Sequence, residues 1–140
     1  MNWLIAEDET DIRNLVKMMC TVWGHNPLVF ENGQRVWDYL DRVEQGEGAE
    51  PVPEFVLMDI RMPGKRGNEI ALRMRSIEPF KRVPIVLMTA FALTEDEMNQ
   101  MQNDYAVDHI INKPLPDFDQ LRILLHNIIK QKDQTGDKAG

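Results

Sequence analysis

Four short apolar runs in this chain end abruptly in polar side chains. The clearest run, residues 55–58, leads directly into an aspartate and then into a glycine-rich segment that contains Pro63. A buried carboxylate is costly unless it is paired or bound to a metal, so such a run is not ordinary core design. The polar residues that follow the four runs are Glu7, Asp8, Asp59, Thr89 and Lys113. The pattern predicts strands that carry these groups to one pocket.

The apolar runs alternate with segments of helical spacing. We predict strands at residues 3–6, 28–30, 55–58, 84–88 and 110–112. Helical periodicity follows each strand and predicts helices at residues 12–23, 36–43, 68–77, 94–105 and 117–128. Residues 45–53 are expected to form a loop. Five strand–helix units of this kind indicate an α/β fold with a doubly wound parallel sheet and right-handed crossovers.

The composition excludes several classes of protein. A net charge of −7 disfavours a general nucleic-acid binder, whose affinity depends on basic side chains. The single Cys20 excludes an internal disulfide. No segment approaches the ~20 apolar residues of a membrane span, and the N-terminus lacks the basic region of a signal peptide. We therefore expect a cytoplasmic protein that binds no membrane, with one domain at residues 1–130 and a polar, flexible tail at residues 131–140.

The polar strand ends predict a particular chemistry. Ligands of open α/β sheets bind outside the carboxyl ends of the strands, where Glu7, Asp8 and Asp59 would meet. Two carboxylates ~4 Å apart repel by about 4 kcal/mol at an effective dielectric constant of ~20, and Mg²⁺ suits such a site. Lys113 adds a compact positive charge and Thr89 adds a hydroxyl group. Together they predict a phosphoryl-transfer site with a carboxylate nucleophile.

Each of these residues also has a simpler interpretation when it is taken alone. Acidic residues favour helix N-termini, and an aspartate before a turn is usually a turn residue. A single threonine or lysine at a strand end is usually structural or solvated. The joint placement of all these residues at strand ends favours the functional interpretation.

With these motifs in view, the chain resembles the receiver domains of two-component response regulators, from about residue 3 to residue 129. The family's acidic pair, its Thr-Ala step and its Lys-Pro step are all present, and its Asp-x-x-Met-Pro-x-x-x-Gly block is complete. They stand at Glu7-Asp8, Asp59, Met62, Pro63, Gly67, Thr89-Ala90 and Lys113-Pro114. The resemblance implies a (βα)5 sheet of the flavodoxin-like or CheY-like kind, with strand order 2-1-3-4-5.

The resemblance also implies roles for the acidic residues. Asp59 would accept a phosphoryl group from a histidine kinase or a histidine phosphotransfer protein. Mg²⁺ would be held by Asp8, Asp59 and the backbone carbonyl of Arg61, with Glu7 acting through water. Such a domain is not an enzyme in the usual sense, because at most it catalyses its own phosphorylation and dephosphorylation.

Further implications concern the phosphoryl group and the output. Lys113 would contact the phosphoryl group, Thr89 would close onto it, and the Lys113–Pro114 bond would be cis. A downstream protein would bind the face formed by the fourth helix, the fifth strand and the fifth helix, and the chain would be a monomer or a weak dimer.

The chain departs from the family at its switch position. Ile110 stands where the family usually has the tyrosine or phenylalanine that swings inward on activation. We expect the loop after Thr89, with Ala90 and Phe91, to respond instead. Arg61 and Phe91 each lie two positions after a site residue, where they would flank the acyl phosphate and slow its hydrolysis.

Other interpretations are weaker. A dehalogenase-like phosphatase would need a second aspartate at the position of Arg61, and a flavin site would be repelled by the acids after the first strand. A receiver-like binding module that works without phosphorylation remains possible because of Ile110. So does a receiver taken from a longer kinase or regulator. His25 and His109 lack partners at metal-like spacing, and His126 is expected to have a surface or interface role.

Overall fold

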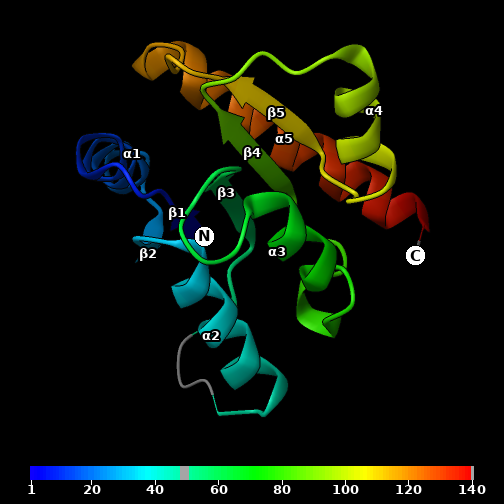
Figure 1. Cartoon of the computed structure of the whole chain (residues 1–140). Helices are drawn as coiled ribbons and strands as arrows, with labels where there is room; N and C mark the ends of the chain where they lie inside the picture. The colour runs from blue at the N-terminus through cyan, green and yellow to red at the C-terminus, as the bar shows by residue number, and fades with distance from the viewer. Residues whose placement is uncertain (48–50, 140) are drawn as a thin grey trace.

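The computed structural model describes residues 1–47 and 51–139, with side chains described as far as Asp133 (Figure 1). Five parallel strands form one sheet in the order β2-β1-β3-β4-β5. The strands are β1 Asn2–Ala6, β2 Asn26–Phe30, β3 Phe55–Asp59, β4 Ile85–Thr89 and β5 His109–Asn112. The helices are α1 Thr10–Val22, α2 Gly33–Glu44, α3 Gly67–Met74, the 3₁₀ turn η1 Glu78–Phe80, α4 Glu95–Asn103 and α5 Phe118–Ala139. The predicted fold and strand order are confirmed.

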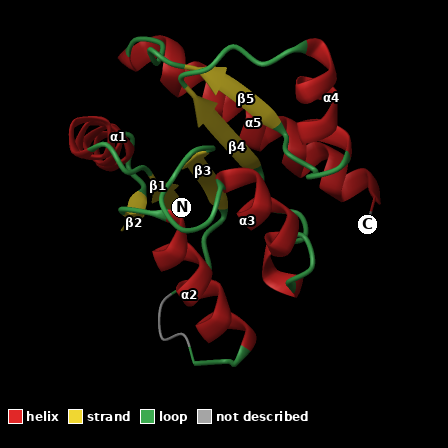
Figure 2. Ribbon diagram, viewed as in Figure 1, coloured by secondary structure: helices red, strands yellow, loops and turns green. Residues whose placement is uncertain are grey.

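Helices cover both faces of the sheet (Figure 2). Alternate side chains of β1 show the division, because Leu4 and Ala6 pack into the core under α2 and α3, whereas Trp3 and Ile5 pack into the core under α1 and α5. Strands β3 and β4 are buried along their whole length, as expected for a parallel sheet that is covered on both faces. The loop predicted at residues 45–53 falls partly on residues 48–50, which lie outside the described residues.

Strand β2 forms one edge of the sheet, and its outward face has few free hydrogen-bonding groups. The Asn26 amide and the Phe30 carbonyl bond toward β1, so the alternate residues Pro27 and Val29 face away from the sheet. Pro27 has no amide hydrogen, which limits pairing with another strand. Within β2, Val29 is therefore the residue with an outward amide N–H.

The last helix is longer than the sequence predicted. Helix α5 continues to Ala139, beyond the predicted end near residue 128, so residues 131–139 are helical; Gly140 lies outside the described residues. The Lys132 ammonium lies 2.9 Å from Oδ1 of Asp108, which joins this part of the helix to the start of β5. Low apolar content indicated a tail, but lysine, glutamine and alanine are good helix formers.

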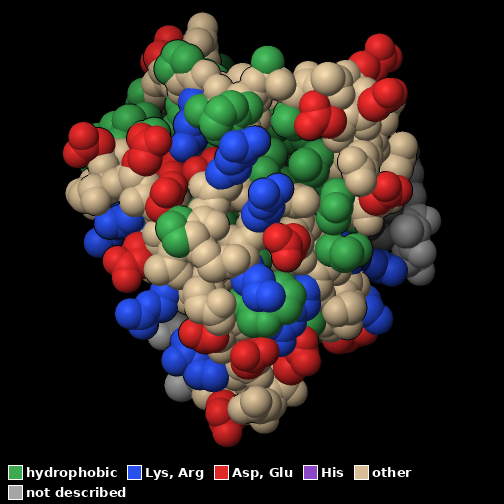
Figure 3. Space-filling view, viewed as in Figure 1, with side chains coloured by type: hydrophobic (Ala, Val, Ile, Leu, Met, Phe, Trp, Pro, Cys, Tyr) green, Lys and Arg blue, Asp and Glu red, His purple; other side chains and the backbone are tan. Residues whose placement is uncertain are grey.

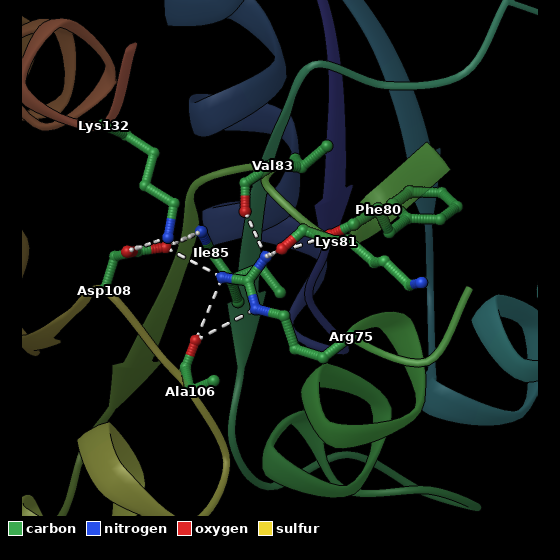
Figure 4. Close-up of polar contacts among 8 residues, drawn as sticks. All are labelled: Arg75, Phe80, Lys81, Val83, Ile85, Ala106, Asp108 and Lys132. Carbon is green, nitrogen blue, oxygen red and sulfur yellow. Dashed lines mark hydrogen bonds and ion pairs between the residues drawn. The ribbon is translucent and has the colours of Figure 1, made fainter. Parts of the chain in front are cut away.

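Asp108 belongs to a polar network at the amino ends of β4 and β5 (Figure 4). Its Oδ2 atom accepts from Arg75 at 3.0 Å and from the Ile85 amide at 2.8 Å. The Arg75 guanidinium also donates to the backbone carbonyls of Phe80, Lys81, Val83 and Ala106. Ala106 has a φ of 55°, which is unfavourable for a residue with a side chain. One arginine therefore links α3, η1, β4 and the turn before β5.

Two histidines that are distant in sequence form a pair between β2 and α5. Nε2 of His25 lies 2.8 Å from Nε2 of His126, and the His25 ring stacks on Trp3 at 4.4 Å. Nδ1 of His126 donates to the Arg122 carbonyl at 2.6 Å, so in the neutral ring Nε2 is the acceptor and His25 is the donor. A proton on the acceptor nitrogen would abolish this hydrogen bond. Neither histidine lies near the polar strand ends.

This pair predicts a loss of stability in mild acid. Burial is the main factor that lowers the pKa of His25, so near pH 6 the unfolded chain binds more protons than the folded chain. The stabilisation is complete above the unfolded pKa of about 6.5 and is lost as the pH falls through the folded pKa. Melting curves at pH 7.5 and 5.5 should show a larger decrease for wild type than for His25→Phe, which keeps the ring stack. Equal decreases would contradict the prediction.

No helix in the described part of the chain combines the length and the apolar character needed to cross a bilayer.

Candidate functional site

The sheet register brings the polar strand ends to one level. Ala6 pairs with Met58, so the residues that follow them, Glu7 and Asp59, are neighbours at the carboxyl edge of the sheet. Thr89 pairs with Asn112, so Thr89 and Lys113 lie beside them on the next two strands. In Figure 1 the arrowheads of β4 and β5 point to this edge. The predicted pocket residues therefore lie together.

Three carboxyl groups converge at this edge. Glu7, Asp8 and Asp59 each offer an oxygen atom, and these oxygens all lie within 4.8 Å of one another. Glu7 is fully buried and Asp59 is 6% exposed, whereas Asp8 is exposed at the mouth of the site. The cluster is thus closed on the inside and open to solvent on the outside, which suits a cation that keeps part of its water.

Lys113 provides the opposing charge within the cluster. Its ammonium nitrogen lies 2.5 Å from Oε1 of Glu7 and 3.4 Å from Oδ2 of Asp59. Burial opposes the positive charge, but the hydrogen bond to Glu7 and the charge of Asp59 prevail and raise the pKa of Lys113. Lys113 therefore lies closer to Glu7 than to Asp59.

The two buried carboxyl groups, Glu7 and Asp59, are poorly stabilised as anions. Burial raises the pKa of Glu7 to about 7, against the opposing effect of its hydrogen bond to Lys113. Burial also raises the pKa of Asp59, and the charge of Asp8 adds to that effect against Lys113. One ammonium group thus fails to neutralise three carboxyl groups, so an additional cation would be favourable here.

The loop after β3 is held against Asp59 by close backbone packing. A Cβ atom at position 67 would clash with the carbonyl oxygen of Asp59, which explains the glycine. The Gly67 amide donates to the Ile60 carbonyl at 2.8 Å. The Pro63 carbonyl accepts from the Gly33 amide at 3.1 Å, which ties the loop to α2. The glycine and proline spacing in this block therefore has a structural cause.

Thr89 and the residues after it form the other wall of the site. Thr89 is 2% exposed, and its Oγ1 accepts from the Phe91 amide at 3.1 Å. Ala90 is exposed, and half of the Phe91 side chain is exposed. The Arg61 guanidinium carbon lies 3.9 Å from the centre of the Phe91 ring, a cation–π contact. Arg61, two residues after Asp59, and Phe91, two residues after Thr89, thus touch each other.

The Lys113–Pro114 peptide bond is cis, as the resemblance implied. The Lys113 amide donates to the Thr89 carbonyl at 2.8 Å, so the start of this turn is joined to the end of β4.

Comparison with known proteins agrees with this geometry. The family model described as "Response regulator receiver domain" matches residues 3–126. The chain belongs to this family. It is a receiver domain of two-component signalling systems.

Two of the relatives of this receiver are larger proteins. It is 26% identical over 135 residues to "Response regulator Rre1" of Synechocystis sp., which covers 96% of this chain and 54% of that protein. It is 31% identical over 127 residues to "Regulatory protein AtoC" of Escherichia coli, covering 91% of this chain and 25% of that protein. The receiver thus spans about half of the first relative and a quarter of the second.

Solved structures share the fold. The receiver domain of sensor histidine kinase PA1611 from Pseudomonas aeruginosa, solved with a magnesium ion in its active-site cleft, is 24% identical with a TM-score of 0.74. That match covers 92% of this chain and 97% of the other. Chemotaxis response regulator CheY4 of Vibrio cholerae is 19% identical with a TM-score of 0.74, covering 91% and 97% of the two chains.

Ile110, the residue at which the sequence departs from the family's usual aromatic, is buried. It is 7% exposed and belongs to the core cluster that includes Leu87 and Val107. Leu93, Met98 and Tyr105, from the α4 region, pack against the same cluster. The side chain at position 110 is therefore aliphatic and is part of the hydrophobic core.

Sequence reasoning gave no role to Arg13, which supports the acidic pair. Its Nη1 atom donates to the backbone carbonyls of Glu7 at 3.0 Å and Asp8 at 3.3 Å. Its Nη2 atom contacts the Thr10 hydroxyl at 3.5 Å. The signal available in the sequence is a basic residue in the first turn of the helix that follows two acids.

The charge imbalance predicts the effect of removing one carboxylate. Asp59→Asn should raise the melting temperature of the metal-free protein, by roughly 4 °C for each kcal/mol of repulsion that is relieved. Mg²⁺ should raise the melting temperature of wild type more than that of the variant. Differential scanning calorimetry with and without Mg²⁺ measures both effects.

A matched control is Glu47→Gln, which removes an exposed acid beyond the end of α2. It should leave the response to Mg²⁺ unchanged. If Asp59→Asn and Glu47→Gln respond equally to Mg²⁺, the three carboxyl groups do not share a cation site.

Proposed function

We propose that this receiver accepts a phosphoryl group on Asp59 from the phosphohistidine of a histidine kinase or of a histidine phosphotransfer protein. The observation that carries the proposal is the convergence of Glu7, Asp8 and Asp59 with Lys113 at the carboxyl edge of the sheet. Thr89, on the adjacent strand end, adds a hydroxyl group.

The proposed reaction is a transfer between two side chains. A carboxylate oxygen of Asp59 attacks the phosphorus atom, an O–P bond forms, and the P–N bond of the phosphohistidine breaks with its electron pair returning to the imidazole. Lys113 would exchange its contact with Glu7 for a phosphoryl oxygen, and the Thr89 hydroxyl would donate to another. Catalysis of this kind depends mainly on position and charge.

The site residues fit a magnesium ion. Glu7, Asp8 and Asp59 supply hard oxygen ligands on one side and leave the solvent side open, and the backbone carbonyl of Arg61 would complete the set. When bound, the ion neutralises negative charge on the carboxylates and the incoming phosphoryl group. The magnesium ion in the cleft of the PA1611 receiver supports this assignment by analogy.

Basic side chains surround the approach to the site. The loop between β3 and α3 contains Arg61, Lys65 and Arg66, and Figure 3 shows Lys and Arg side chains over this loop. Such charges favour the approach of an anionic donor toward a protein of net charge −7. The proposed downstream partner is a protein that binds the face of α4, β5 and α5. Helix α4 suits that role because it has no buried residue.

Intact-protein mass after incubation with acetyl phosphate tests the proposed reaction. Wild type should gain one labile phosphoryl group that requires Mg²⁺, and Asp59→Asn should gain none. Asp104→Asn, an exposed acid after α4, should behave as wild type. If wild type forms no adduct and also fails to bind beryllofluoride, the domain is a binding module that works without phosphorylation.

The structure around Phe91 predicts a long-lived acyl phosphate. Arg61 and Phe91 lie in contact with each other, and each follows a site residue by two positions, so together they would restrict the attacking water. Phe91→Ala should therefore lose the phosphoryl group several-fold faster than wild type, as measured by mass over time. Phe118→Ala removes another exposed ring at the start of α5 and should leave the rate unchanged. Faster loss from wild type than from Phe91→Ala would refute this prediction.

The buried Ile110 predicts where activation changes the structure. Because this residue already lies in the core, we propose that phosphorylation moves the loop from Thr89 to Leu93 rather than the side chain of β5. NMR spectra with beryllofluoride should show large shifts at Ala90 and Phe91 and small shifts in α5. Large shifts at Ile110 and along α5 would make this prediction wrong.

A further inference from the structure

A second pocket lies at the outer edge of the sheet, away from Thr89 and Lys113. It has a volume of about 520 Å³ and is open to solvent. Strand β2 forms its floor, and helices α1 and α2 contribute its sides. The residues that matter for its chemistry are Arg13, Val29, Phe30, Arg35, Asp38 and Arg42. This volume is in the range of pockets that hold small organic ligands.

The pocket contains more positive than negative charge. Three guanidinium groups line it with two carboxylates, Glu31 and Asp38. The ion pair between Arg35 and Glu31 is long, at 3.8 Å, and both side chains are more than half exposed. The Arg42 guanidinium has no hydrogen-bond or ion-pair partner in the described part of the chain. This local excess contrasts with the net charge of −7 for the whole protein.

Two further groups add donors that are already in place. The amide of Val29 faces outward from the edge strand and is not used by β1. The guanidinium of Arg13 is held by two backbone carbonyls and a hydroxyl group, so its hydrogen bonds are made but its charge is not neutralised. Phe30, which is half-buried with its ring against Tyr39, also lines the pocket. Guanidinium groups and a free amide are the donors that bind phosphate oxygens.

We propose that this pocket binds a small organic phosphate with at least two negative charges, of the nucleoside diphosphate class. One inorganic phosphate would engage only part of a site whose three guanidinium groups come from two helices. The apolar residues Val29 and Phe30 in the lining offer a contact for the organic part of the ligand. The proposal concerns a site other than the one at Asp59, and it holds whether or not Asp59 is the phosphoacceptor.

Arg13 connects this pocket to the acidic cluster. The guanidinium that lines the pocket also holds the carbonyls of Glu7 and Asp8. A phosphate that draws Arg13 toward the pocket changes the backbone that carries two of the three clustered carboxyl groups. Binding at the two sites is therefore coupled, and the coupling acts in both directions.

Two-dimensional NMR titration tests the site with ADP, pyrophosphate and adenosine, in EDTA to exclude metal effects. Asp59→Asn serves as the background protein, so failure of phosphorylation does not affect the result. ADP and pyrophosphate should shift the amides of Val29, Phe30 and α2, and adenosine should not. Arg42→Gln should weaken ADP binding about tenfold, the effect of one charge-assisted contact.

The control is Arg82→Gln, which removes an exposed arginine that lines a different pocket and should leave ADP binding unchanged. Absence of binding at millimolar ADP and pyrophosphate would overturn the proposal. So would equal weakening by Arg42→Gln and Arg82→Gln, because that result indicates general charge screening. Binding of ADP and adenosine without pyrophosphate would overturn the phosphate assignment.

Arg13→Lys separates binding from coupling, because lysine keeps the charge but lacks the fork that spans two carbonyls. In the parent protein, ADP should also shift the amides of Glu7 and Asp8. In Arg13→Lys those shifts should be lost while the shifts at Val29 remain. Unchanged shifts at Glu7 and Asp8 in this variant would contradict the coupling.

Discussion

The close approach of three carboxyl groups and one ammonium group is the interaction on which the rest of this receiver depends. Glu7 and Asp59 are buried beside each other because parallel strands in register end at the same level. The ammonium group of Lys113 lies nearer to Glu7 than to Asp59, so Asp59 is the less neutralised of the two buried acids. A buried anion with incomplete pairing is unfavourable on its own. The same property makes the site receptive to a cation and to the charge changes of phosphoryl transfer.

The sequence was sufficient for the fold and for the grouping of the polar strand ends. Alternating apolar runs and helical segments determine a parallel sheet, and in such a sheet strand ends become neighbours whatever their distance along the chain. That is why Glu7 and Lys113, which are far apart in sequence, could be placed together without a structure. The capping box of Thr94 and Glu97 was also predictable, because it depends on residues only three positions apart.

Other contacts could not be predicted, because they depend on how side chains meet in three dimensions. His25 and His126 share no motif, and they meet only because β2 and α5 flank the same part of the core. The helical state of residues 131–139 was missed because low apolar content gave no helical pattern there, whereas in the structure Lys132 reaches Asp108, the residue before β5. Arg13 looked like an ordinary helical residue until its bonds to the backbone of the acidic pair were seen.

The amino and carboxyl ends of the strands differ in how tightly the neighbouring segments are held. At the amino edge, Arg75 and Asp108 bind several backbone groups from four elements, so this edge is held by many short contacts. At the carboxyl ends of the strands, the segment after β4 has fewer polar contacts: Phe91 donates to the Thr89 hydroxyl and stacks on Arg61, and helix α4 beyond it has no fully buried residue. A change of charge at Asp59 is therefore accommodated more easily by movement of the segment after β4 than by movement of the segments at the amino ends of the strands. Structural responses to phosphorylation should follow this difference in restraint, toward the loop that carries Phe91.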